Sequence, residues 1–275
     1  MSVSLATPKL LPVAATLLLM PLAPSGHLVS GSLVVLNSAD DYIAIAADSK
    51  GVSQKGASYD RCKIVALDNR LVYAATGYTS RADVSQIGGT WDASALAKQW
   101  YRSLANNPRH ELIPKLAEAL GASLASRLNQ SVEAHPQEGW PPLLVTALFA
   151  GFDENGKRII IAVDAMKTSE RHVGYTARLL PDDVHAVLSG ETAIAQEYTA
   201  GRTPRAQSWQ KSMALENAGF GLKQRLIQGA EKIVVLTEQY DPAFVGGPID
   251  TVVISREAGV TWIHRKPECA KGFGR

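Results

Sequence analysis

The sequence predicts an α+β fold in which two antiparallel sheets stack face to face and helices cover both outer faces, a four-layer αββα sandwich. Two observations predict this class. Segments with strand character come first, followed by two helices, further strands, further helices and closing strands. No internal repeat or low-complexity linker separates a second domain. With 275 residues, 46% of them hydrophobic, the chain can bury one large core.

In the first part of the sequence, from Val29 to Ala75, segments typical of strands alternate with segments typical of turns. Short β-branched runs are interrupted by polar or glycine-containing stretches at residues 37–41, 51–60 and 68–69. Strands are therefore expected at Leu33 to Leu36, Tyr42 to Ala46, Lys63 to Leu67 and Leu71 to Gly77.

Two helices are expected next, because apolar residues recur at helical spacing. Residues 92–104 place Leu96, Trp100 and Leu104 on one face, and residues 112–128 carry a leucine at every fourth position. Asn107-Pro108 predicts the N-cap and first position of the second helix.

Strand character then returns. Residues 143–152 and 158–164 flank a hairpin turn built around Asn155-Gly156. A strand follows at Val184 to Leu188, then helices at residues 191–198 and 211–238, with Gly219-Phe220-Gly221 as a point of division. Residues 249–255 and 260–264 predict the last two strands.

Residues 1–31 differ from the rest. Lys9 is the only charged side chain before Asp40, and Leu10 to Leu22 is apolar apart from Thr16. That run is too short to span a bilayer as a helix but suits a secretory signal, with cleavage before Gly26 or after Gly31. The sequence thus predicts a signal peptide or propeptide over 1–31, a domain over 32–265, a tail over 266–275, and a periplasmic or secreted protein. The alternatives are an uncleaved anchor and a wrongly chosen start codon.

Composition excludes several function classes. The formal charge of +2, with no lysine- or arginine-rich run, gives no reason to expect nucleic acid as a partner. Cys62 and Cys269 suit an exported protein with at most one disulfide and cannot form a zinc site alone. Their pairing cannot be judged from sequence, and two unrelated thiols is the interpretation slightly favoured. No metal site and no cofactor is expected.

Gly31-Ser32 is the most informative dipeptide for function. If the chain is cut between these residues, Ser32 gains a free α-amine beside its own hydroxyl. An α-amine ordinarily has a pKa of roughly 8, so it can take the hydroxyl proton near neutral pH and act as the general base. The alternative is an ordinary strand serine behind a glycine.

The chain contains, in this order, Gly31-Ser32, Ala46-Ala47-Asp48-Ser49-Lys50, Lys63 at the head of a strand, and Leu71 to Gly77. Together these segments resemble the proteasome β-subunit family, bacterial relatives included, within the N-terminal-nucleophile hydrolases. The Ser32 to Asp48 separation matches the family's spacing, and Asp48 to Lys63 is one residue shorter. The resemblance runs from about Ser32 to about His264.

The resemblance implies a role for each matching residue. Ser32 is the nucleophile in place of the usual threonine, and Lys63 lies near its hydroxyl with Asp48 as ion-pair partner. Gly77 donates its backbone N–H to the oxyanion hole, and Ser189 hydrogen-bonds the terminal amine. The plainer interpretations are a structural salt bridge for Asp48 and Lys63 and a turn glycine for Gly77. Lys50 is interpreted as structural.

One expected element departs from the family pattern. The family often has Asp-x-x-Ser-Gly-Gly late in the chain, supporting the amine. Here Asp241 to Gly247 keeps Gly246 and Gly247 but has Val245 where the serine belongs, and Asp241 lies one residue farther away. This favours a non-catalytic member.

The sequence leads to one functional prediction and two alternatives. The prediction is a self-activated, proteasome-like hydrolase that cleaves peptide or other amide bonds and assembles as a homo-oligomer, without a membrane partner after signal removal. The alternatives are a non-catalytic binding or scaffold subunit and a small-molecule amidase on the same fold.

Overall fold

The computed structural model describes residues 32–52, 58–81, 91–134 and 139–270. The predicted signal segment, the cleavage point before Gly26 and the glycine of Gly31-Ser32 lie outside the described residues.

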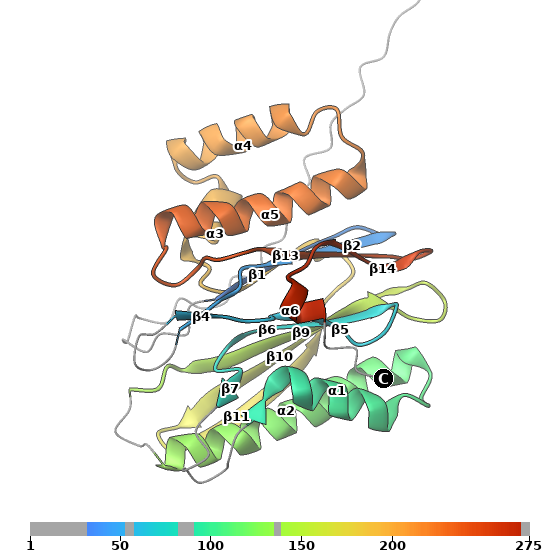
Figure 1. Cartoon of the computed structure of the whole chain (residues 1–275), viewed down its shortest axis with the longest axis vertical. Coiled ribbons are helices and arrows are strands. Elements are labelled where there is room, and N and C mark those ends of the chain that lie inside the picture. The colour runs from blue at the N-terminus through green and yellow to red at the C-terminus, as the bar shows by residue number, and fades with distance from the viewer. Residues whose placement is uncertain (1–31, 53–57, 82–90, 135–138, 271–275) are drawn as a thin grey trace, which may run out of the picture.

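Two five-stranded antiparallel sheets form the centre of the molecule (Figure 1). The first has the order β12-β1-β2-β13-β14, with β1 at Leu33–Ser38, β2 at Tyr42–Ala47, β12 at Ala186–Gly190, β13 at Asp250–Ser255 and β14 at Gly259–His264. The second has the order β11-β10-β9-β6-β5, with β5 at Ile64–Ala66, β6 at Leu71–Gly77, β9 at Leu143–Phe152, β10 at Arg158–Ser169 and β11 at His172–Leu179. Two short hairpins pair β3 (Lys50–Val52) with β4 (Ser58–Asp60) and β7 (Ser80–Arg81) with β8 (Trp91–Asp92).

Successive side chains of a strand point to opposite faces of its sheet, so neighbouring residues pack in different hydrophobic cores. In β1, Val34 and Leu36 pack with apolar residues of β6 and β9, so they lie between the two sheets. Leu33 and Val35 face the other way and pack against α5 (Leu222–Tyr240). All four side chains are buried, so a shift of β1 by one residue would move each side chain into the opposite core.

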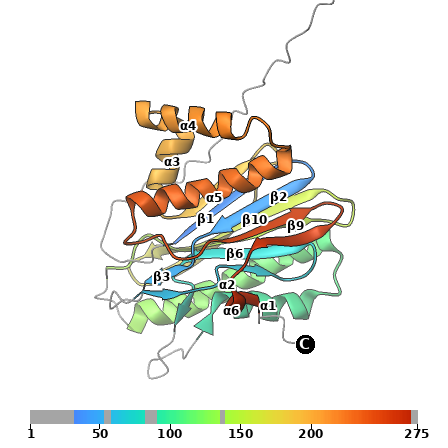
Figure 2. The same cartoon turned by 45° about the horizontal axis from the view of Figure 1, so that its top comes forward.

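Helices cover the outer face of each sheet. The second sheet is covered by α1 (Ala93–Leu104) and α2 (Arg109–Ala134). Leu116, Leu120 and Leu124 of α2 lie in one hydrophobic cluster with Tyr73 of β6 and Phe149 of β9. On the first sheet lies α5, accompanied by α3 (Ala193–Ala200), while α4 (Pro204–Glu216) lies beyond α5, away from the sheet (Figure 2). The predicted α+β class with two antiparallel sheets is confirmed, and the layering is compatible with the predicted sandwich.

Several element boundaries differ from the predicted ones. The side chain of Asn107 donates to the carbonyl of Leu104 (2.8 Å), so it provides a partner for a backbone acceptor at the end of α1. It does not cap α2, which begins at Arg109. The prediction of Asn107 as that N-cap was wrong. The first of the last two long helices, α4, begins at Pro204, where Thr203 accepts a hydrogen bond from the Ala206 N–H (3.2 Å). The division at Gly219 to Gly221 is confirmed, because α5 begins at Leu222.

Candidate active site

Ser32 immediately precedes β1 and is buried, with 5% of its surface exposed. Its carbonyl accepts a hydrogen bond from the Glu191 N–H (2.7 Å), and the next residue, Leu33, pairs with Gly190 at the end of β12. Gly190 has φ +99°, a conformation that favours glycine, and a Cβ there would lie 1.9 Å from the Ser32 carbonyl oxygen. The end of β12 therefore holds the backbone of Ser32 in place.

The carboxylate of Asp48, just after β2, accepts hydrogen bonds from several segments. Its Oδ1 accepts from the Leu33 N–H (2.7 Å) and the Lys63 Nζ (2.6 Å), and its Oδ2 accepts from the Lys50 N–H (3.1 Å) and the Gly246 N–H (3.2 Å). All four contacts are donors, which suits the ionised, acceptor-only carboxylate. Asp48 thus joins the residue after Ser32 to Lys63.

Lys63 lies just before β5, and its carbonyl accepts from the Ala75 N–H of β6 (3.2 Å). Its side chain is 3% exposed and that of Asp48 is not exposed at all. Burial lowers the pKa of the Lys63 ammonium to about 8 against the attraction of Asp48, and the charges of Arg61 and Lys266 lower it further. Burial likewise raises the pKa of Asp48, opposed by Lys63 and the backbone donors. Lys63 is therefore a cation that can be discharged in the mildly alkaline range.

Ser189 and Gly77, the other two predicted site residues, belong to different sheets that meet here. Ser189 of β12 pairs with Val34 of β1. The Oγ of Ser189 lies 2.6 Å from the Oγ1 of Thr76, a buried hydroxyl at the end of β6. Gly77 follows Thr76 with φ +92° and pairs with Val145 of β9. The structure thus gathers Ser32, Asp48, Lys63 and Ser189 at adjoining strand ends, with Gly77 one residue from the Thr76–Ser189 contact.

The loop that departs from the family pattern also reaches the site. Gly246 bonds the Asp48 carboxylate through its N–H and accepts from the Lys50 N–H through its carbonyl (2.9 Å). Val245 is fully buried and packs in the same cluster as Leu33. The Nζ of Lys50 donates to the Pro242 carbonyl, which fits the structural role predicted for this lysine.

Sequence reasoning missed Thr76 and Gly246 as parts of this arrangement. The retained Gly246-Gly247 pair was a usable signal for the second, because a glycine allows a backbone N–H to approach a carboxylate closely. No signal pointed to Thr76, whose position follows from the meeting of two sheets.

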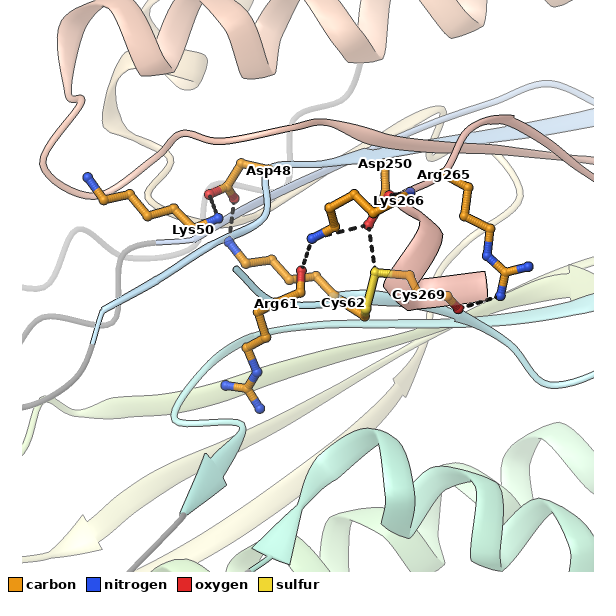
Figure 3. Close-up of polar contacts among 9 residues, drawn as sticks. Asp48, Lys50, Arg61, Cys62, Asp250, Arg265, Lys266 and Cys269 are labelled. Carbon is orange, nitrogen blue, oxygen red and sulfur yellow. Dashed lines mark hydrogen bonds and ion pairs between the residues drawn. A yellow bond between two sulfur atoms is a disulfide. The ribbon is translucent and has the colours of Figure 1, made fainter. Parts of the chain in front are cut away.

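The interpretation of the cysteines as two unrelated thiols was wrong. Cys62 and Cys269 form a disulfide, and their Cα atoms lie 5.5 Å apart. The disulfide joins the residue before Lys63 to the short helix α6 (Pro267–Ala270), so this part of the predicted tail is attached to the body of the domain (Figure 3).

Neither a metal centre nor a membrane-spanning helix is found among the described residues. They contain no group of three or more histidine, cysteine or acidic side chains arranged to hold a metal ion. None of the helices in the described ranges combines the length and apolar character needed to cross a membrane.

Comparison with known proteins leaves the family open: no protein-family model matches the chain, and a search of curated proteins finds no significant match.

Proposed function

We propose that the chain is the precursor of a hydrolase that cleaves peptide or other amide bonds with an N-terminal serine nucleophile, Ser32, in a proteasome-like N-terminal-nucleophile fold. Removal of residues 1–31 releases the nucleophile. In this proposal signal peptidase cuts after Gly31, or it cuts earlier and the Ser32 hydroxyl attacks the Gly31 carbonyl. In the second case the Gly31–Ser32 amide bond breaks as the ester on Oγ forms, the freed nitrogen keeps the hydroxyl proton as the α-amine, and water hydrolyses the ester to release the leader. The Cys62–Cys269 disulfide supports an exported protein, since disulfides persist in oxidising compartments.

The observation that carries the proposal is the shared oxygen of Asp48. Oδ1 bonds both the N–H of Leu33, the residue after Ser32, and the ammonium of Lys63. A buried ion pair is costly unless its geometry and hydrogen bonds are complete. Here all four hydrogen bonds to the carboxylate come from donors. In the proposal, the Lys63 cation acts on the freed amine of Ser32 and lowers the pKa of that amine.

The proposed chemistry consists of two acyl transfers, first to Ser32 and then to water, each with its own proton transfer through the α-amine. The α-amine of Ser32 takes the Oγ proton as Oγ attacks the substrate carbonyl, and the same proton passes to the departing amine. An ester on Ser32 remains. Water then gives a proton to the α-amine and attacks the ester, and the proton returns to Oγ when the acid leaves. The Lys63 cation favours the neutral amine throughout, and no cofactor takes part in these steps.

One observation favours a second candidate, a non-catalytic binding subunit. Val245, which stands where the family has an amine-supporting serine, is fully buried in the apolar cluster and offers no hydroxyl. This candidate keeps the fold and the ion pair but requires no cut before Ser32. Assembly into a homo-oligomer is compatible with either candidate and remains part of the proposal.

The experiment compares wild type with Ser32→Ala and Ser32→Thr on fluorogenic peptide amides. The enzyme hypothesis expects turnover in wild type, turnover in Ser32→Thr, which keeps a hydroxyl, and none in Ser32→Ala. Ser212→Ala, an exposed helical serine, is the matched control and should behave as wild type. Equal turnover in Ser32→Ala and wild type excludes Ser32 as the nucleophile, and a protein that keeps Gly31 and hydrolyses no amide favours the binding subunit.

A further inference from the structure

The C-terminal segment holds the chain that carries Lys63. Cys269 is bonded to Cys62, the residue directly before Lys63. The Nζ of Lys266 donates to the carbonyl of Arg61 at 2.5 Å (Figure 3). Two consecutive residues before Lys63 are thus fastened to residues near the C-terminus, one covalently and one by a hydrogen bond from a cation.

The same lysine also holds the chain that carries Asp48. The backbone N–H of Lys266 donates to Asp250 Oδ1 (2.9 Å), and its Nζ lies 3.7 Å from Asp250 Oδ2. Asp250 pairs with Ala47, which directly precedes Asp48. Lys266 therefore contacts both segments whose relative position determines the Lys63–Asp48 pair.

Lys266 is buried at a site where a cation is costly. Its side chain is 5% exposed and that of Asp250 is 2% exposed. Apolar residues of similar volume often replace a buried ion pair without loss of stability, so stability alone is a weak reason for this one. The two buried pairs also interact, because the charge of Lys266 lowers the pKa of Lys63.

We propose that Lys266, fastened by the Cys62–Cys269 disulfide, is a positioning residue that holds Lys63 against Asp48. The catalytic part of this inference rests on the proposed function. The charged side chains that surround Lys63 come from several segments, namely Asp48 after β2, Arg61 before β5, and Lys266 with its partner Asp250 of β13.

The test follows the titration of Lys63 itself by NMR, in oxidised protein labelled with ¹³C at the lysine Cε. Lys63→Arg, which removes the lysine signal and keeps a cation beside Asp48, identifies the signal. Lys266→Met removes one nearby cation, so the Lys63 midpoint should rise by roughly half a pH unit or more. Lys157→Met, which removes an exposed cation in the turn between β9 and β10, is the control and should leave the midpoint unchanged.

A second variant keeps every charge. Cys62→Ser/Cys269→Ser releases α6, so Lys266 is no longer fastened and Lys63 becomes better hydrated. Its midpoint should also rise, and this variant decides the question if Lys266→Met does not fold. An unchanged Lys63 midpoint in the folded variants overturns the inference.

Activity supplies a separate readout. In Lys266→Met and in the double cysteine variant, kcat should fall roughly tenfold or more because Lys63 is misplaced. Lys266→Arg retains the charge and should therefore retain most of the wild-type kcat. Hydrolysis that depends on Ser32, together with an unmoved Lys63 titration, rejects this inference and leaves the proposed function standing. Hydrolysis independent of Ser32 rejects the proposed function, and the NMR titration still decides the role of Lys266.

Discussion

Gly190 lies so close to Ser32 that a methyl group on its Cα would be 1.9 Å from the Ser32 carbonyl oxygen. The close approach coincides with a positive φ, so two independent causes require glycine at the end of β12. The position of Ser32 therefore depends on a residue that follows Ser189 in β12, far along the chain.

Gly190→Ala should lower the free energy of unfolding by about 2 kcal/mol or more, because the new Cβ meets backbone in an unfavourable conformation. It should also displace Ser32 and reduce hydrolysis. Urea unfolding and kcat measure the two effects. Gly219→Ala is the control, since a Cβ there meets nothing within 4 Å. Equal stability and activity in the two variants would show that the contact does not constrain Ser32.

Lys63→Met should destabilise the fold strongly. It leaves the buried Asp48 carboxylate without its cation, and breaking a buried pair in this way costs about 3–5 kcal/mol. The matched control is Lys115→Met, which breaks an exposed pair with Glu111 on α2 and should cause no measurable loss. Chemical denaturation of both variants checks this. Similar unfolding midpoints would mean that the Asp48–Lys63 pair is not buried as described.

The proposed hydrolysis should decline in mildly alkaline solution. Lys63 is needed as a cation, and its pKa is lowered to about 8, so the charged form is lost as the pH rises through that value. The profile of kcat/KM against pH should show this descending limb. A profile that stays level to pH 10 would contradict a role for the Lys63 charge.

Lys63→Arg provides a check on the assignment of that limb. An arginine stays charged throughout the range, so whatever activity the variant retains should not decline near pH 8. A descending limb at the same pH in this variant would assign the titration to another group.

Local signals in the sequence were sufficient for much of the fold. The leucines of α2, the turn at Asn155-Gly156 and the break at Gly219 to Gly221 each depend on neighbours in sequence, and each prediction was confirmed. Strand β11, which was not predicted, lies at a sheet edge with mostly half-buried or exposed residues, so its sequence lacks a clear apolar alternation. The Thr203-Pro204 start of α4 was readable and was overlooked.

The candidate site likewise contains some contacts that the sequence indicated and others that depend only on tertiary packing. Asp48 and Lys63 were paired in advance through a family resemblance, and the structure brings them within 2.6 Å. The contacts of Thr76 with Ser189 and of Lys266 with Asp250 come from the packing of separate segments, so no local pattern announces them. The disulfide belongs to the same class, because pairing depends on the distance between cysteines far apart in sequence.

The N-terminal residue of the hydrolytically active protein tests the central claim most directly. N-terminal sequencing and intact mass, applied to protein isolated from its native compartment and assayed in the same preparation, should give a chain that begins at Ser32 with an unmodified α-amine. Amide hydrolysis by a preparation in which Gly31 is still joined to Ser32 would contradict the account.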